Sequence, residues 1–241
     1  MVAKSQLKLI KKLHQKKYRN ENKLFFVEGI KVITDLLASG LKPFQLLATE
    51  EKIESFPQGS QVDKVAANDL KTISALKNPN GYFGVFHHPK NLGIDFEDWI
   101  LALDAVQDPG NLGTIIRLCD WFGIAHLVCS NDTVDCFNPK VVQATMGSIA
   151  RVNIHYLDLS NFLDDIDVPV LGAFMNGNSV YNESFRKPGV LLMGNEANGI
   201  STTLEALISK KISIPQFGNQ TTESLNVAMA TGILLNEIRR I

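Results

Sequence analysis

The sequence predicts an α/β fold in which helices cover both faces of a largely parallel sheet. From Trp99 onward, short apolar segments alternate regularly with helical patterns, an order that is typical of parallel sheets. A polar stretch that contains proline and glycine, residues 87–93, precedes this region and is interpreted as a linker. The 241-residue chain is therefore expected to form two domains, over residues 1–90 and 98–241.

Helical and strand-like segments also alternate in the first 90 residues. Apolar runs predict strands at 24–27, 44–48, 61–65 and 82–86. Helical patterns predict helices at 5–17, at 29–38, and from a cap at Asn68 to Leu76. A dense turn cluster at 77–81 separates the last helix from the last strand.

Strands and helices alternate throughout the rest of the chain. Strands are expected at 99–103, 125–129, 152–156, 168–174, 189–193 and 211–214. Helices are expected at 111–122, 138–147, 159–166, 199–208 and 224–240. The strands at 189–193 and 211–214 each end at a polar loop with glycine. Because open α/β sheets bind ligands at the carboxyl ends of their strands, we expect these two loops to lie side by side and to form a site.

Charge is unevenly distributed along a chain whose net charge is −1. Basic residues crowd the start of the sequence, namely Lys4, Lys8, Lys11, Lys12, Lys16, Lys17, Arg19, Lys23 and Lys31. This pattern indicates a polyanion partner. It is equally compatible with a solvated helix face, because Leu7, Ile10 and Leu13 supply an apolar stripe opposite the lysines.

Cysteine, histidine and hydropathy patterns indicate a cytoplasmic protein without a metal. Cys119, Cys129 and Cys136 have no CxxC spacing and are expected to be buried, reduced thiols. His87 and His88 have no cysteine or carboxylate at ligand spacing, so we expect solvated linker residues. No apolar run approaches the roughly 18 residues of a membrane span. The basic N-terminus is not followed by the apolar core of a signal peptide.

The first segment that could take part in chemistry covers residues 103–117, where a strand is followed by a Pro-Gly turn and a helix. Asn111 is a good helix cap, and a helix N-terminus favours an anion. Arg117 lies one turn beyond Gly113, where the helix dipole disfavours a cation, so it is expected to have an anionic partner or a task. The segment has neither the P-loop nor the G-x-G-x-x-G pattern. A plain strand–helix turn is the alternative.

The second segment is Gly194-Asn195-Glu196-x-x-Gly199, which follows an apolar strand. Its glycines permit close approach of a ligand to the main chain. Glu196 is expected either to hold a hydroxyl group or to pair with Arg117. The alternative is a turn with a solvated glutamate.

The third segment begins at Ile214-Pro215 and resumes at Ser224-Leu225-Asn226. Pro215 stops the strand, and Ser224 or Thr222 is expected to cap the following helix. Ser224 could serve a site at the same time. In that helix Ala228 and Gly232 are small residues one turn apart, which permits close helix–helix contact.

In this order the three segments resemble the SpoU (TrmH-like) branch of the SPOUT RNA methyltransferases. The matching residues are Asn111, Gly113 and Arg117, then Gly194, Glu196 and Gly199, then Ile214, Pro215 and 224–228. Residues 138–148 resemble the family's middle segment, with Thr145 where serine is common. Residues 17–19 and 25–29 are similar to the L30e-like substrate-binding domain that often precedes this catalytic domain.

The resemblance implies a C-terminal SPOUT domain with a deep trefoil knot, preceded by a small L30e-like α/β domain. It implies that S-adenosylmethionine binds in the knot against Gly194, Ile214 and Leu225. It also implies a homodimer to which the C-terminal helix contributes, and the Ala228/Gly232 stripe is consistent with that contact.

The implied reaction is methyl transfer to a ribose 2′-hydroxyl, and it needs no metal. Arg117 is the candidate catalytic residue, either as the base or as a group that orients the hydroxyl and stabilises the alkoxide. The residues implied to position Arg117, RNA or the cofactor are Asn111, Glu196, Ser224 and Asn226.

The two-domain layout with an L30e-like front resembles the family's ribosomal RNA enzymes more than its transfer RNA enzymes, which implies ribosomal RNA as the substrate. A methyltransferase of transfer RNA is the alternative within this class. Two other classes stay open on the residues alone. One is an RNA-binding protein without catalysis, and the other is a nucleotide-dependent enzyme that uses the loop from Asn111 to Gly113 as a phosphate site.

Overall fold

Contacts between residues divide the chain into two units. The computed structural model describes residues 2–90, 92–218 and 223–240. The first unit holds the chain up to Lys90 together with Asp135–Ala150, and the second holds the remainder. The chain thus leaves the second unit after Val134 and returns to it at Arg151. The domain limits expected from the sequence, 1–90 and 98–241, stay a prediction. The structure groups Asp135–Ala150 with the first unit, which the sequence did not suggest.

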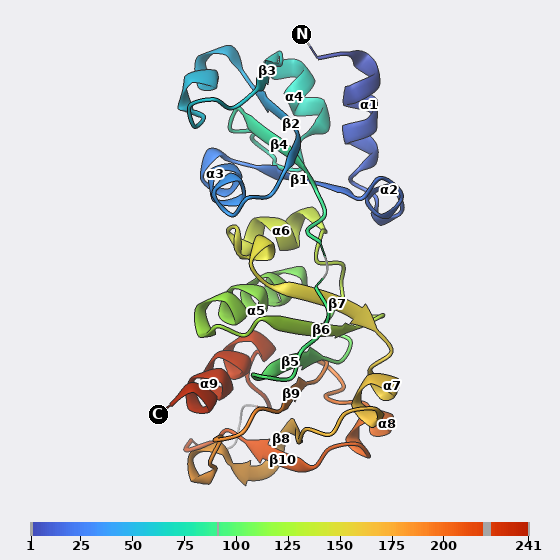
Figure 1. Cartoon of the computed structure of the whole chain (residues 1–241), viewed down its shortest axis with the longest axis vertical. Helices are drawn as coiled ribbons and strands as arrows, with labels where there is room; N and C mark the ends of the chain where they lie inside the picture. Colours follow the sequence, from blue (N-terminus) through green and yellow to red (C-terminus); the bar gives the residue numbers. More distant parts are fainter. Residues whose placement is uncertain (1, 91, 219–222, 241) are drawn as a thin grey trace. The chain divides into compact units, whose positions relative to one another are not determined.

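A mixed four-stranded sheet forms the centre of the first unit (Figure 1). Its strands, in the order β1-β4-β2-β3, are β1 (Leu24–Glu28), β4 (Tyr82–His87), β2 (Pro43–Ala48) and β3 (Val62–Lys64). Strand β4 pairs antiparallel with both β1 and β2, and β3 is parallel to β2. All four strands occur where the apolar runs predicted them, within one or two residues at each end.

The helices of the first unit begin and end differently from the sequence prediction in two places. They are α1 (Lys4–Lys12), α2 (Lys16–Asn22), α3 (Ile30–Ala38), α4 (Ala67–Ile73) and α6 (Pro139–Thr145), with 3-10 turns η1 (Glu50–Ser55) and η2 (Ser148–Ala150). The single helix predicted at 5–17 is two helices, because Gln15 is extended and begins a second helix. Asn68 lies inside α4, which starts after Ala66 without a side-chain cap, so the predicted Asn68 cap is wrong.

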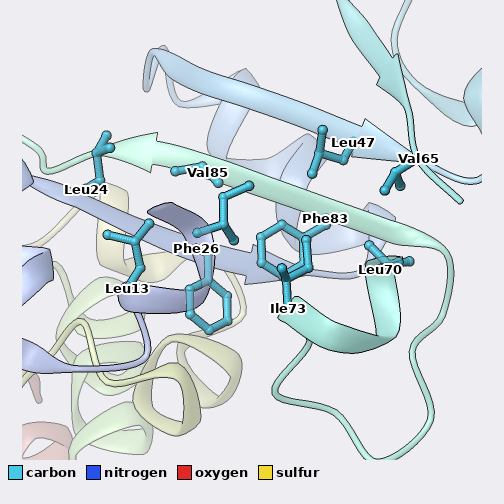
Figure 2. Close-up of a cluster of buried hydrophobic side chains, with 10 residues drawn as sticks. Leu13, Leu24, Phe26, Leu47, Val65, Leu70, Ile73, Phe83 and Val85 are labelled. Atoms are coloured by element: carbon cyan, nitrogen blue, oxygen red, sulfur yellow. The ribbon is translucent and has the colours of Figure 1, made fainter. Parts of the chain in front are cut away.

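One face of this sheet is covered by α1 and α4, whose apolar side chains meet those of β1 and β4 (Figure 2). Leu13 and Ile73 are fully buried there, and the rings of Phe26 and Phe83 stack with centroids 5.1 Å apart. Burial of each such side chain stabilises the unit by about 1.5–3 kcal/mol. The apolar side of α1 is therefore fixed to the core, and its lysines are left on the surface.

The opposite face of the sheet is covered by α3 and α6. Gly84 of β4 leaves room for Ile33 of α3, whose Cγ1 would lie 3.2 Å from a Cβ at position 84. Phe137, just before α6, packs on Phe25 of β1 with ring centroids 5.0 Å apart. Its ring also stacks on His88 at 3.8 Å.

His87 and His88, which were expected to be solvated, differ in environment. His87 is exposed, whereas His88 is half-buried against Phe137, and burial lowers the pKa of His88 to about 4. The prediction of a solvated residue is therefore wrong for His88. Hydrophobic packing, rather than a linker role, accounts for its position.

A six-stranded parallel sheet forms the centre of the second unit (Figure 1). Its order is β10-β8-β9-β5-β6-β7, with β5 (Ile100–Leu103), β6 (His126–Ser130), β7 (Asn153–Leu157), β8 (Val170–Ser179), β9 (Val190–Met193) and β10 (Lys210–Ser213). Every neighbouring pair is parallel, which confirms the predicted fold class. Only β8 is clearly longer than predicted. The deep trefoil knot stays a prediction.

Helices cover both faces of the parallel sheet. They are α5 (Pro109–Phe122), α7 (Leu159–Asp164), α8 (Thr202–Glu205) and α9 (Val227–Arg239), with a 3-10 turn η3 (Val180–Asn182). Figure 1 shows α5 and α9 together on one side and α7 and α8 on the other. Apolar side chains of α7 and α8 pack on Ile100, Val190 and Leu192. The predicted helix 199–208 is reduced to the single turn of α8.

Helix α9 packs against α5 within the same chain. Ala228 is buried, and a Cβ at Gly232 would lie 3.5 Å from a methyl group of Leu118 on α5. Arg239 donates to both carboxylate oxygens of Asp98 and to the carbonyl oxygen of Phe122. Those hydrogen bonds lower the pKa of Asp98. The small residues of α9 therefore serve a close helix–helix contact inside one chain, and their place in a dimer interface stays a prediction.

All three cysteines are buried thiols outside any disulfide, as predicted. Across residues 2–90, 92–218 and 223–240, no helix has the length and apolar character that a membrane crossing requires.

Candidate active site

The order of the parallel sheet creates a switch point between β5 and β9. After β5 the chain continues to β6 on one side, whereas after β9 it continues to β10 on the other side, beyond β8. Leu103 and Met193, at the carboxyl ends of β5 and β9, are partners in register. Ligands of open α/β sheets bind at such a point, because two loops diverge there and leave a crevice.

The sequence predicted that the loop after β10 would lie beside residues 194–199, and the structure shows a different neighbour. Strand β8 lies between β9 and β10, so the loop after β9 has the loop after β5 as its direct neighbour. The segment after β10 reaches the same edge through its last residue, Asn226, as the contacts below show. The expected site therefore consists of three segments at one edge of the sheet.

The loop after β5 is held in an unusual conformation. Ala105 has φ of 53°, in the left-handed region that residues other than glycine rarely adopt. Its N–H donates to Ser130 Oγ at 2.9 Å, and the carboxylate of the preceding Asp104 accepts the Ser201 N–H at 2.7 Å. Such a backbone conformation costs on the order of 1–3 kcal/mol and is concentrated at functional sites.

Asn195 fixes the loop after β9 to the end of β5. Its side-chain amide donates to the carbonyl oxygen of Ala105 at 2.6 Å, and its backbone forms two hydrogen bonds with Gly199, each of 2.9 Å. A Cβ at Gly194 would lie 2.2 Å from the carbonyl carbon of Gly199, so only glycine fits position 194. The conformation of this loop is therefore fixed by close main-chain packing and by Asn195.

Asn111 is not the cap of α5, contrary to the prediction. Asp108 is the cap and accepts the Asn111 N–H at 2.8 Å, with Pro109 as the first helical residue. The side chain of Asn111 is thereby free for other contacts. Its Nδ2 donates to Glu196 Oε1 at 3.0 Å, and its Oδ1 accepts from Asn226 Nδ2 at 2.8 Å.

Glu196 lies over the N-terminus of α5. Besides Asn111, its carboxylate accepts the backbone N–H groups of Gln107 and Asp108, each at 3.4 Å. A carboxylate is favourable there, because the first N–H groups of a helix carry a partial positive charge. Of the two roles that the sequence left open for Glu196, pairing with Arg117 is not found.

Asn226, rather than Ser224, caps α9. Its Oδ1 accepts the N–H groups of Ala228 and Met229 at 3.0 and 3.2 Å. This fixes the side-chain orientation, so its Nδ2 points to Asn111. The expected Ser224 cap is therefore wrong, and Thr222 lies outside the described residues.

Asn226, Asn111 and Glu196 thus form a hydrogen-bonded chain, the asparagine chain, that joins the three predicted segments. The other predicted residues take no part in it. Gly194 packs on Gly199, while Ile214 is half-buried. Ser224 is exposed, and the side chain of Leu225 is 50% exposed.

Arg117 is exposed on α5, on the stripe that also carries Thr114 and Trp121. In the part of the chain that the structure describes, its guanidinium group has neither an ion pair nor a hydrogen bond. The expected anionic partner for Arg117 is thus not found among the described residues, and the group is available to a ligand.

Three residues that organise the site were not singled out from the sequence. They are Asp104, Asp108 and Asn195, which hold the loops after β5 and β9. A signal was present for Asp108, because proline is favoured directly after a helix cap and Pro109 follows it. Nothing in the local sequence indicated the contacts of Asp104 and Asn195, whose partners are about 90 positions away.

Family comparisons agree with this geometry. Residues 98–236 match the SpoU rRNA Methylase family, and residues 4–84 match the MRM3-like substrate binding domain. The chain belongs to the SpoU rRNA methylase family. The predicted resemblance is confirmed, and the asparagine chain joins segments that all lie within the family match.

Relatives of this SpoU family member match it over nearly its whole length. The 23S rRNA (guanosine(2553)-2′-O)-methyltransferase RlmP of Bacillus subtilis is 31% identical over 235 residues, covering 95% of this chain and 94% of that one. A structure of a TrmH-family protein from Porphyromonas gingivalis has 37% identity and a TM-score of 0.89, covering 99% and 98%. An rRNA methyltransferase from Sinorhizobium meliloti with bound AdoMet has 32% identity and a TM-score of 0.85, covering 99% and 96%.

Proposed function

We propose that this SpoU family member transfers a methyl group from S-adenosylmethionine to a ribose 2′-hydroxyl of ribosomal RNA. The observation that supports this most directly is the asparagine chain, which assembles the three motif segments at the switch point of the sheet. Family membership supports the reaction class. The substrate-binding match over residues 4–84 supports a large RNA as the substrate.

Gly194, Ile214 and Leu225 are the residues proposed to hold S-adenosylmethionine. The close packing of Gly194 on Gly199 fixes the loop after β9 beside the switch point, and the half-exposed Leu225 offers an apolar surface for the face of a purine. These features fit the cofactor. When bound, S-adenosylmethionine supplies a methyl group on a cationic sulfur, and that methyl carbon is electrophilic without help from a metal.

Gly194→Ala is expected to weaken S-adenosylmethionine binding. The new Cβ has to displace the main chain of Gly199 and Ile200, and such overpacking costs about 1–3 kcal/mol. If the loop has to regain its wild-type conformation to bind the cofactor, that cost raises Kd about 5–150-fold. Isothermal titration calorimetry measures the change. Gly93→Ala is the matched control outside the proposed site, because no atom of the described residues lies within 4 Å of a Cβ there. Equal affinities for the two variants would count against this loop as the cofactor site.

On the RNA side, the proposed catalytic group is Arg117. Its guanidinium is always charged and offers several donors, so it stabilises the alkoxide that develops as the 2′-hydroxyl loses its proton. Asn111, Glu196 and Asn226 are proposed to hold the N-terminus of α5, and with it Arg117, in a fixed position. Ser224, exposed two residues before Asn226, is proposed to contact RNA or cofactor.

The function is tested by mapping 2′-O-methyl groups in the RNA of a strain that lacks this gene. We expect one ribosomal mark to disappear, and the purified protein to restore it in that RNA with labelled S-adenosylmethionine. Loss of a transfer RNA mark with all ribosomal marks intact would overturn the choice of substrate. Binding of RNA without any transfer would overturn the choice of an enzyme.

A homodimer is proposed on the exposed apolar side chains of α5 and α9. Trp121 of α5 and Met229 of α9 are 84% and 64% exposed. Large exposed apolar side chains are typical of protein–protein contacts. We expect sedimentation equilibrium to give a mass twice that of the 26.6 kDa chain, and Trp121→Glu to shift it to the monomer. A monomeric wild-type protein would contradict the proposal.

A cytoplasmic location is proposed on the state of the cysteines. Cys119, Cys129 and Cys136 are all buried thiols outside any disulfide. Free buried thiols are typical of proteins in a reducing compartment.

A further inference from the structure

The first 23 residues form a strongly basic surface on the first unit. They contain seven lysines and one arginine against a single acidic residue, Glu21, whereas the whole chain has a net charge of −1. Arg19 is buried and is no part of this surface. All seven lysines are exposed, and together they are termed the lysine face: Lys4, Lys8, Lys11, Lys12, Lys16, Lys17 and Lys23.

The lysine face has a rigid support. Lys4, Lys8 and Lys11 follow one another at helical spacing along α1, while Ile10 and Leu13 are fully buried in the core of the unit. The three ammonium groups are therefore presented in a row by a helix that cannot rotate without exposing its apolar side. In the described part of the chain, none of these three lysines has an ion pair or a hydrogen bond.

Helix α1 differs from an ordinary solvated helix face. Such faces combine charges of both signs, with acidic and basic residues paired one turn apart. Helix α1 contains no acidic residue, and Lys4 occupies its first position, where the helix dipole disfavours a cation. The charge pattern therefore weakens the isolated helix.

Further positive charge is concentrated around Tyr18 of α2. The ammonium nitrogens of Lys12 and Lys17 lie 5.0 and 6.0 Å from the centre of the Tyr18 ring. Glu21, the one acidic residue of α2, approaches Lys17 only to 3.9 Å and is itself exposed. An aromatic ring among lysines is a common arrangement on surfaces that contact nucleic acid.

We propose that the lysine face binds the phosphate backbone of the RNA substrate. A row of like charges without acidic partners is stabilised by a polyanion, and release of the counterions of RNA favours the complex. The lysine ammonium group is a compact charge and lacks the paired, directional N–H donors of arginine. This surface therefore supplies affinity and orientation rather than base recognition. The inference rests on the proposed function and names the surface by which the first unit holds RNA.

The test compares the wild-type protein with the variant K4Q/K8Q/K11Q. The RNA is total ribosomal RNA from the strain that lacks the gene, and its affinity is measured by filter binding at several KCl concentrations. If all three lysines contact phosphates, the slope of log K against log[KCl] falls by about two to three, and affinity at low salt falls about tenfold or more. The KM for RNA rises, whereas kcat and the Kd of S-adenosylmethionine stay as in the wild type.

Two further variants make the result specific. K31Q/K77Q/K187Q removes the same charge from exposed lysines outside the lysine face and is expected to keep the wild-type slope. K4R/K8R/K11R keeps the charge and is expected to keep the affinity. An unchanged slope in K4Q/K8Q/K11Q, or an equal loss in K31Q/K77Q/K187Q, overturns the proposal. Because binding is measured without catalysis, a protein that fails to methylate RNA still gives a readable slope.

Discussion

Arg117→Ala is expected to lower kcat for methyl transfer to RNA about 10²–10³-fold, the usual effect of removing one donor that stabilises a developing oxyanion. The physical reason is the position of the group. The guanidinium is exposed at the surface of α5, and no side chain of the described residues neutralises it. Its charge is therefore available to the substrate, while a group already paired within the protein would have to break that pair first.

The measurement separates a catalytic role from a structural one. Single-turnover transfer of labelled methyl groups gives the rate of the chemical step, and calorimetry gives the Kd of S-adenosylmethionine. That Kd should stay within about twofold, because Arg117 forms no hydrogen bond with the described residues of the proposed cofactor loops. Arg117→Lys keeps the charge but loses the planar guanidinium group with its parallel N–H donors, and it is expected to retain only part of the rate. If Arg117→Lys is as active as the wild type, a charge alone suffices.

Matched controls are available on the same unit. Arg186→Ala removes another exposed arginine, and Thr114→Ala changes the exposed side of α5 one turn before Arg117. Both are expected to transfer methyl groups at close to the wild-type rate. An Arg117→Ala protein that is as active as these controls would show that the catalytic group lies elsewhere.

The parallel sheet was predictable because its signal is local. Each central strand, such as 190–193, is apolar on both faces, and each is followed by a polar loop and a helical pattern. The order of the strands is not local. It decides that the loop after β9 adjoins the loop after β5, and no periodicity in the sequence carries that information.

Helix caps illustrate a second limit of local patterns. Asn111 and Asp108 are both good cap residues, as are Ser224 and Asn226, and the structure uses the second of each pair. Which residue caps the helix depends on where the chain turns, and that is decided by packing. The distinction matters for function, because Asn111 joins the asparagine chain only because it does not cap α5.

Arg19 shows how a partner far away in the sequence can overrule a prediction made from neighbouring residues. Within its sequence neighbourhood it is one of many basic residues that indicated either a polyanion partner or a solvated helix face. Its side chain is instead 3% exposed and pairs with Asp135, 116 positions away. The residue that neutralises it lies in the segment that the chain contributes from between β6 and β7.

Asp135→Ala is expected to destabilise the first unit by about 3–5 kcal/mol, because it leaves a buried guanidinium without its counterion. The Asp135 carboxylate accepts from Arg19 Nε at 3.1 Å and from Nη2 at 2.5 Å, and it also accepts the Phe137 N–H at 3.1 Å. Arg19 further donates to the carbonyl oxygens of Leu13 and His14. Those two bonds fix the guanidinium in place, so it cannot swing out to water without breaking them.

Hydrogen exchange of the backbone amides of β1 and α6 measures this effect within the first unit, without requiring the whole chain to unfold in one step. Asp135→Asn keeps the shape of the side chain and one acceptor, so an intermediate increase in exchange is expected. Glu50→Ala is the control in the same unit, because it breaks an ion pair with Lys64 whose carboxylate is 76% exposed. It should leave the exchange of β1 and α6 within about threefold of the wild type.

The expected consequence for function follows from the place of Asp135 in the chain. It begins the segment Asp135–Ala150, both ends of which continue into the second unit at β6 and β7. Loss of the Arg19–Asp135 pair should therefore release α6 and reduce RNA binding, while the asparagine chain and S-adenosylmethionine binding are retained. If exchange of α6 in Asp135→Ala rises no more than in Glu50→Ala, the pair does not hold this segment, and the packing of Phe137 on Phe25 and His88 suffices.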